Sequence, residues 1–150
     1  MFTITYNNQN LTTKIEKDVR KIKCIIRNRW IILTNEEWVR QHVLTYLIQN
    51  CNYPKVLIAV EKKIVTHETT KRFDILVYNQ NLLPHLLIEV KQLNWAITDA
   101  EVQQVLNYQS VLQARYFALT NGSNHVVFEV NNGLVTMLPS YPTYNDCTIL

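Results

Sequence analysis

The segment PHLLIEVKQ, residues 84–92, carries a glutamate and a lysine near the end of an otherwise apolar, strand-like run. Because side chains alternate across a strand, Glu89 and Lys91 point to the same face. The preceding run KRFDILVY is also strand-like, and a turn through residues 80–83 pairs the two runs as a hairpin with Asp74 directly opposite Glu89. Two opposed carboxylates repel each other, and Lys91 supplies only part of the positive charge that they need.

A divalent cation would supply the rest. Mg²⁺ prefers a few carboxylates together with waters and phosphate oxygens, and Mn²⁺ is expected to substitute for it. Such an ion activates water and stabilises charge on a phosphoryl group, as phosphodiester hydrolysis requires. The pattern predicts Asp74 and Glu89 as metal ligands, with Lys91 orienting the water or stabilising the transition state. The alternative is a purely structural ion-pair cluster at a sheet edge.

An E-x-K triplet is a weak signal by itself, and the run Glu61-Lys62-Lys63 has the same form. What distinguishes the second triplet is Asp74, fifteen residues upstream of Glu89 on the partner strand of the same hairpin. Glu61 is therefore predicted to be a solvated strand end.

Two helices and several strands are expected around the hairpin. LTNEEWVRQHVLTYLIQNCNYP predicts a helix that Thr34 caps, with Glu37 completing a capping box and Pro54 beyond its end. ITDAEVQQVLNYQSVLQA predicts a second helix with Thr98 and Glu101 in the same roles. PKVLIAVEKKIVTH, RYFALT, HVVFEV and GLVTML are strand-like. The economical arrangement is an α/β (α+β) fold with a mixed central β-sheet flanked by helices.

Composition suits one globular domain. The chain has 150 residues, 47% hydrophobic and 18% charged, with no linker-like or repetitive tract. It lacks an apolar run long enough for a membrane helix and a signal-peptide pattern at its start, so a cytoplasmic protein without a membrane partner is expected. Cys24, Cys51 and Cys147 are too far apart for a CxxC site and predict reduced, mostly buried thiols. The C-terminal PSYPTYNDCTIL predicts a loosely packed tail.

Positive charge is concentrated near the start of the chain. The net charge of +3 is too small to identify a nucleic-acid-binding protein, but seven of the fifteen Lys and Arg residues fall within 14–29, opposed only by Glu16 and Asp18. Such a cluster suits phosphate contact, and the alternative is a solvated surface segment. This segment is predicted to be irregular, with room for one short strand.

With KRFDILVY, LLIEVK and QVLNY, the chain resembles the PD-(D/E)xK nuclease superfamily, and more narrowly the N-terminal nuclease domain of type I restriction enzyme R (HsdR) subunits. The resemblance runs from about Leu33 to Val130. It includes TNEEWVR, similar to that family's T-P-E-E-x-V-R, the Asp strand, the E-x-K strand, a Q-x-x-x-Y helix and a strand ending in Thr-Asn-Gly. It implies a single restriction-endonuclease-like nuclease domain over residues 1–150, with its core at about 33–138.

The resemblance also implies roles for individual residues. Asp74 and Glu89 would bind Mg²⁺, Lys91 would assist hydrolysis, and Gln104 with Tyr108 would support the active site and contact DNA. Gln104 and Tyr108 are four residues apart and so share a helix face, although such residues are often only boundary residues of a core.

Many superfamily members place an auxiliary acid on the first helix, and Glu36 is the predicted candidate here. Its heptad spacing with Val39 and Val43 points it toward the sheet, whereas Glu37 is accounted for by the cap. The resemblance itself does not choose between the adjacent glutamates, so Glu37 stays open.

Two departures from the family limit what carries over. Asn35 replaces the usual proline at the first helical position, which costs little because that position needs no hydrogen-bonded N–H. No G-x-x-x-x-G-K-[ST] loop is present, so ATP-driven translocation is not expected of this chain.

The leading hypothesis is a Mg²⁺-dependent endonuclease that hydrolyses phosphodiester bonds of DNA. The alternative is a non-catalytic nucleic-acid-binding or assembly module with a nuclease fold. Because cutting both strands of a duplex usually requires two active sites, a homodimer or a larger restriction-type complex is a reasonable partner expectation.

Overall fold

The computed structural model describes residues 1–6 and 11–145. Its strands are β1 (Thr13–Glu16), β2 (Val19–Lys23), β3 (Trp30–Ile32), β4 (Ile58–Val65), β5 (Thr70–Tyr78), β6 (Pro84–Val90), β7 (Tyr116–Thr120), β8 (His125–Asn131) and β9 (Leu134–Leu138). Its α-helices are α1 (Asn35–Gln49) and α2 (Asp99–Asn107), and short 3₁₀ turns cover Lys55–Leu57 and Tyr108–Ser110. Neither described α-helix is long and apolar enough to cross a membrane.

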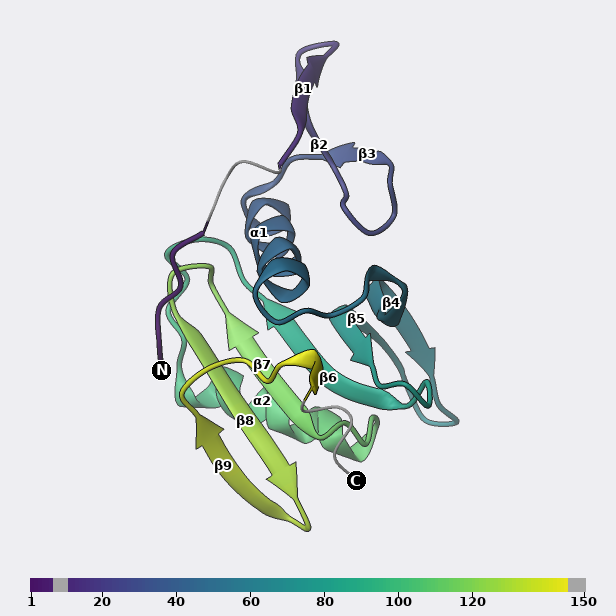
Figure 1. Cartoon of the computed structure of the whole chain (residues 1–150), viewed down its shortest axis with the longest axis vertical. Coiled ribbons are helices and arrows are strands. Elements are labelled where there is room, and N and C mark those ends of the chain that lie inside the picture. The colour runs from purple at the N-terminus through teal and green to yellow at the C-terminus, as the bar shows by residue number, and fades with distance from the viewer. Residues whose placement is uncertain (7–10, 146–150) are drawn as a thin grey trace.

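The central sheet has six strands in the order β4-β5-β6-β7-β8-β9 (Figure 1). Strands β6 and β7 run parallel and all other neighbours run antiparallel. Parallel neighbours need a crossover connection, and α2 lies in the segment that supplies it. The sequence-based expectation of a mixed α/β sheet with two helices is confirmed.

The two helices cover opposite faces of this sheet, so the inner strands are apolar on both sides. One core cluster joins Val43 and Leu47 of α1 to Ile88 of β6, and a second joins Val105 of α2 to Leu87, the next residue along β6 toward the chain start. Burial on both faces explains why β6 and β7 read as continuous apolar runs. A charged residue on β6 therefore lies among core residues and requires a specific partner.

Both predicted helix starts are present. The Thr34 side chain accepts a hydrogen bond from the Glu37 backbone N–H at 3.0 Å, as expected of an N-cap. At α2, Thr98 and Glu101 form the complete capping box. These local signals fix where each helix begins, and hence where their side chains stand relative to the sheet.

The basic segment 14–29 is more regular than expected, which corrects the prediction. It forms most of an antiparallel three-stranded sheet, β1-β2-β3, that projects beyond α1 in Figure 1. The turn between β1 and β2 holds Lys17 and Asp18 at φ values of 49° and 60°. Such turns are usually signalled by Asn or Gly, and neither stands at these two positions, so the hairpin is difficult to recognise from sequence.

The expectation of a loose C-terminal tail is wrong for residues 139–145. Tyr141 is 3% exposed and packs in the same cluster as α1, and the Tyr144 N–H donates to the Cys51 carbonyl at 2.8 Å. Cys24 and Cys51 are buried free thiols, as predicted. Residues 146–150, including Cys147, lie outside the described part of the chain.

Tyr141 belongs to a buried polar network centred on His125 of β8. The hydroxyl groups of Tyr6 and Tyr141 lie 3.0 Å from Nε2 and 3.1 Å from Nδ1 of His125, respectively. Burial lowers the pKa of His125 from 6.5 to about 4. Its ring is neutral in the folded protein at pH values where an unfolded chain would carry a charged histidine.

The folded state should consequently be less stable in mild acid than at neutral pH. Between pH 6.5 and 4 the unfolded state binds a proton at His125 that the folded state does not, so lowering the pH from 7 to 5 should cost about 2 kcal/mol of unfolding free energy at this residue. Urea denaturation at both pH values should show this loss in the native protein and a smaller loss in His125→Gln. The exposed His67 gives the matched control, His67→Gln, which should behave as the native protein does. An identical pH response in native and His125→Gln proteins would contradict the assignment.

Candidate functional site

The β5–β6 hairpin brings Asp74 and Glu89 together in the predicted register, although its turn differs from the prediction, because Tyr78 pairs with Pro84 and the register shifts between Val77 and Tyr78. Ile75 pairs with Ile88 and Leu76 with Leu87, so the next position places Asp74 against Glu89. The Asp74 carboxylate also satisfies the backbone there, because its Oδ2 accepts a hydrogen bond from the Val90 N–H at 2.8 Å. Asp74 is thereby fixed in the plane of the sheet at the end of the paired region.

Simple alternation fails at Asp74 itself. Its neighbours Phe73 and Ile75 should share a face, yet Phe73 packs in the cluster under α2 and Ile75 in the cluster under α1. On the adjacent strand β4, Glu61 has a φ of 50°, which is consistent with a local distortion at this level of the sheet. The distortion lets Asp74 face Glu89 and still reach a side chain from α1.

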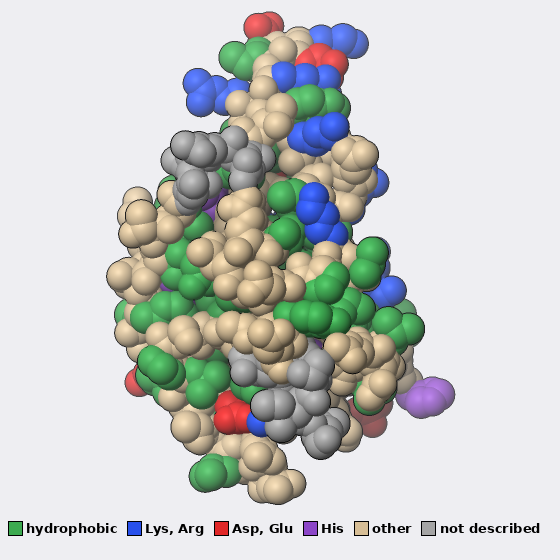
Figure 2. Space-filling view, in the orientation of Figure 1, with side chains coloured by type: hydrophobic (Ala, Val, Ile, Leu, Met, Phe, Trp, Pro, Cys, Tyr) green, Lys and Arg blue, Asp and Glu red, His purple; other side chains and the backbone are tan. Residues whose placement is uncertain are grey.

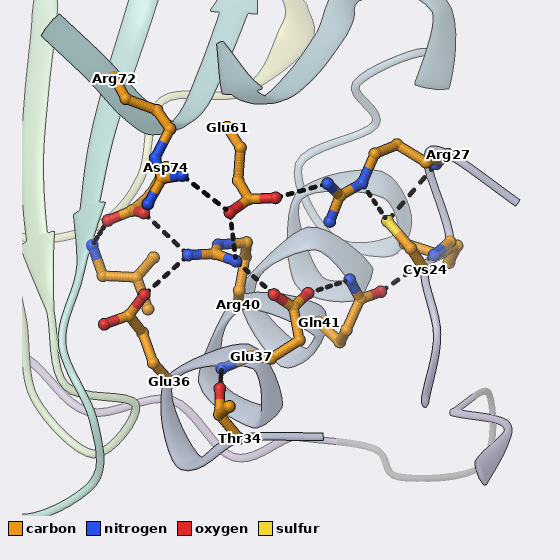
Figure 3. Close-up of polar contacts among 12 residues, drawn as sticks. Cys24, Arg27, Thr34, Glu36, Glu37, Arg40, Gln41, Glu61, Arg72 and Asp74 are labelled. Carbon is orange, nitrogen blue, oxygen red and sulfur yellow. Dashed lines mark hydrogen bonds and ion pairs between the residues drawn. The ribbon is translucent and has the colours of Figure 1, made fainter. Parts of the chain in front are cut away.

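That side chain is Arg40, which is only 4% exposed (Figure 3). Its Nη2 donates to Asp74 Oδ1 and to Glu36 Oε1, both at 2.8 Å, and its Nη1 forms an ion pair with Glu37. Sequence reasoning missed Arg40. A signal was available, since Arg40 follows Glu36 by four residues and Glu37 by three, the spacings at which side chains meet on a helix.

The two glutamates of α1 have different surroundings. Glu37 is buried, and its carboxylate pairs with Arg40 and accepts from Gln41 Nε2 at 2.8 Å, so the predicted use of this carboxylate in a capping box is wrong. Glu36 is half-exposed, and burial together with the charge of Asp74 raises its pKa. The charge of Glu36 interacts with those of Asp74, Lys91 and Glu89.

Glu89 and Lys91 form a partly buried pair beside Asp74. Lys91 Nζ donates to Glu89 Oε1 at 3.2 Å, and the two side chains are 25% and 16% exposed, respectively. Burial, followed by the charge of Asp74, raises the pKa of Glu89 even though Lys91 opposes the shift. Burial acts to lower the pKa of Lys91, but Glu89 and Asp74 raise it overall. The cluster is thus short of positive charge, and its lysine stays protonated at neutral pH.

Gln104 and Tyr108 stand at the edge of this cluster. The Gln104 Nε2 lies 3.4 Å from the Tyr108 hydroxyl, and the Tyr108 ring meets Phe73 edge-on with centroids 5.2 Å apart. Burial and then the charge of Glu89 raise the pKa of Tyr108. Tyr108 is therefore within electrostatic reach of the acids, whereas the exposed Gln104 meets the cluster through Tyr108.

Glu61 is not the solvated strand end that its two following lysines suggested. Its carboxylate forms an ion pair with Arg27 and lies 4.0 Å from Arg40 Nη1 and 3.9 Å from Arg72 Nη1 (Figure 3). The correction has an electrostatic reason, because three arginines from different elements converge where β4 is distorted. No sequence pattern near Glu61 predicts its contacts with these arginines.

Asp74 and Glu89 are the described acids that could bind a divalent cation at this site. Among residues 1–6 and 11–145, no three His, Cys, Asp or Glu side chains converge closely enough to form a ready-made metal cage. Mg²⁺ does not require one, since it binds through one or two carboxylates and waters. Asp74 and Glu89 meet that requirement, because Asp74 Oδ1, Asp74 Oδ2 and Glu89 Oε1 each accept one hydrogen bond here and a carboxylate oxygen can accept more than one.

Comparison with known proteins places this arrangement in a family. The model of the type I restriction enzyme R protein N terminus (HSDR_N) matches residues 35–142. A solved structure described as a fragment of an HsdR subunit of a type I restriction enzyme from Vibrio vulnificus YJ016 shares the fold, with a TM-score of 0.56 and 19% sequence identity. The similarity covers 77% of this chain and 24% of that one, so this chain spans about a quarter of the length of that structure. No curated protein matches the sequence. Since the family model matches more than half of the residues, the chain belongs to the type I restriction enzyme R protein N-terminal (HSDR_N) family.

Proposed function

We propose that the chain is a Mg²⁺-dependent endonuclease module that hydrolyses phosphodiester bonds of DNA within a type I restriction system. The observation that carries the proposal is the meeting of Asp74, Glu89 and Lys91 at the end of the β5–β6 hairpin. Glu36 reaches the same place from α1. Family membership supports the proposal, because the matched segment, residues 35–142, contains all of these side chains.

Asp74 and Glu89 are the proposed ligands of Mg²⁺ or Mn²⁺, and the bound ion would activate water and neutralise charge on the phosphoryl group. The raised pKa of Glu89, caused by burial and by Asp74, means that its charged form is less stable here than in water, and a further cation would stabilise it. Arg40 holds Asp74 through one oxygen, which keeps that carboxylate in place before any ligand arrives. The two proposed ligands thus lie side by side at the end of the β5–β6 hairpin.

The remaining polar groups would handle the proton and the substrate. Lys91 is held protonated by Glu89 and Asp74, so it acts as a hydrogen-bond donor to the attacking water or to a phosphate oxygen, not as a base. Glu36, with its pKa raised by burial and by Asp74, is the better placed proton acceptor. Tyr108 keeps its hydroxyl proton and can donate it to the DNA backbone, with Gln104 beside that hydroxyl as the positioning residue.

Lys91→Ala provides the test of the proposal. The native chain should cut plasmid and single-stranded DNA with Mg²⁺ or Mn²⁺, and Lys91→Ala should cut about a hundredfold more slowly, as when one charge-stabilising donor is removed. Lys55, an exposed lysine after α1, gives the control Lys55→Ala, which should keep native activity. Nicked circles would indicate cleavage of one strand, and linear DNA would indicate two active sites acting together. Equal activity of Lys91→Ala and native protein would overturn the proposal.

A second candidate is a non-catalytic nucleic-acid-binding or assembly module. One observation favours it, namely that Arg40 already pairs with Asp74 and so supplies part of the charge that a metal ion would provide. This function predicts DNA binding without turnover and tolerance of Lys91→Ala. A DNA-binding assay run beside the cleavage assay separates the two candidates.

A further inference from the structure

The sheet β1-β2-β3 carries a large share of the positive charge of the molecule. Its span, residues 13–32, holds seven of the fifteen Lys and Arg residues but only two of the twelve Asp and Glu residues, a net charge of +5 against −2 for the rest of the chain. Figure 2 shows these side chains gathered on the projecting end. The span precedes residue 35 and so lies outside the segment that the family model matches.

Most of this charge is not neutralised by the protein. Lys14 and Lys21 share Glu16, and Arg27 pairs with Glu61. Within the described part of the chain, the other four cations form no ion pair and are exposed: Lys17, Arg20, Lys23 and Arg29. Uncompensated cations on a projecting element attract a polyanion.

One face of the sheet combines lysines with apolar side chains. The register pairs Lys14 with Lys21 and Lys23 with Trp30, and directly paired residues share a face. Trp30 is 36% exposed and Lys14 Nζ lies 4.6 Å from the centre of its ring. Ile32, paired with Lys21, is 63% exposed on the same face. Nucleic-acid-binding surfaces use this combination, since lysines contact phosphates and an aromatic ring can stack on a base or sugar.

Two polar contacts link the sheet β1-β2-β3 to the residues around the candidate active site. Arg27, in the turn between β2 and β3, pairs with Glu61, which lies 4.0 Å from the Asp74 partner Arg40 (Figure 3). The Ile25 N–H donates to Gln41 on α1 at 3.0 Å. The basic sheet therefore has a fixed position relative to Asp74, as a surface that guides a long substrate to that site should have.

We propose that β1-β2-β3 is a DNA-binding arm that contacts the phosphodiester backbone of duplex DNA without reading its sequence. The inference rests on the proposed function in taking DNA as the ligand, and it adds a binding surface separate from the cluster around Asp74. Contacts to phosphates release counterions, so binding through the arm should weaken as salt rises.

The experiment measures affinity for a fluorescent 30-base-pair duplex by anisotropy in EDTA, over a range of salt concentrations. The arm variant is Lys17→Asn with Lys23→Gln, because both lysines are exposed and asparagine tolerates the positive φ at position 17. The control, Lys55→Gln with Lys62→Gln, removes the same charge from exposed positions outside the arm. The arm variant should bind about tenfold more weakly, with a slope of log K against log salt reduced by about 2, and the control should change far less.

Charge-preserving and competing probes complete the test. Lys23→Arg should bind as the native protein does, because it keeps the positive charge at position 23. Equal losses in arm and control variants, or no loss in either, would overturn the arm, as would binding of phosphatidylserine vesicles but not the duplex through the same lysines. EDTA prevents turnover, so the binding assay does not depend on the proposed hydrolysis. If the arm binds DNA but the protein does not cleave it with metal, the proposed hydrolysis alone is refuted. If the protein cleaves DNA but the arm variant binds with native affinity, the arm alone is refuted.

Discussion

Asp74→Asn is expected to reduce DNA cleavage by about two to three orders of magnitude, the loss typical of removing one preorganised charged group from an active site. The substitution keeps the size of the side chain but removes the charge that raises the pKa of Glu89 and would hold a divalent cation. The measurement is the rate of plasmid cleavage in Mg²⁺ and in Mn²⁺, with calorimetric titration of Mn²⁺ as an independent readout of metal affinity.

The same substitution should also weaken the fold, and that effect must be separated from catalysis. Asp74 accepts from Arg40 through one oxygen and from the Val90 N–H through the other. The side chain of asparagine has only one accepting oxygen, so either Arg40 or the Val90 N–H loses its acceptor. The expected cost is about 1 to 3 kcal/mol. Urea denaturation of Asp74→Asn, at the temperature and in the buffer of the activity assay, shows whether the variant is folded under those conditions.

Glu129 offers the matched control. Glu129 lies on strand β8 and pairs with Arg115 at 2.7 Å, so Glu129→Gln also removes a carboxylate from an ion pair. Cleavage and Mn²⁺ affinity should stay native in this variant. Native cleavage rates in Asp74→Asn, or equal losses in both variants, would show that Asp74 has no special role in hydrolysis.

Arg40→Met is expected to destabilise the protein by about 3 to 5 kcal/mol, the cost of removing one partner of a buried ion pair. Arg40 is 4% exposed, and two of its partners, Glu37 and Asp74, are 7% and 16% exposed. Without the guanidinium, these carboxylates remain in a poorly solvated place, where Lys91 offsets only part of the charge of Asp74. The midpoint and slope of urea unfolding, followed by circular dichroism, measure the loss.

Two further variants test the reason for that loss. Arg115→Met removes an arginine from the more exposed pair with Glu129, where about 1 kcal/mol or less is expected. Combining Arg40→Met with Glu37→Leu removes both charges of the buried pair, and should recover much of the lost stability. A loss below 1 kcal/mol in Arg40→Met, or no recovery in the double variant, would contradict a structural role for this network.

The positions of the elements around the site follow from local sequence patterns. Thr34 and Thr98 cap the two helices, and the register predicted for β5 and β6 is the one that brings Asp74 to Glu89, although the turn is one residue longer than predicted. These features are predictable because capping and hairpin register depend on residues that are close together in the chain. The family resemblance was confirmed for the fold and the family, whereas the catalytic roles of Asp74, Glu89, Lys91, Gln104, Tyr108 and Glu36 stay predictions.

The tertiary structure alone decided which charges meet between α1, the β2–β3 turn and the central sheet. Arg40 and Asp74 are 34 residues apart, as are Arg27 and Glu61, and no pattern along the chain links either pair. Glu37 illustrates the difference, because its spacing from Thr34 suggested a cap while burial beside Arg40 and Gln41 determined its actual contacts. An ionic interaction depends on distance and solvent exposure in three dimensions, and both are set only when the helix packs on the distorted strands of the sheet.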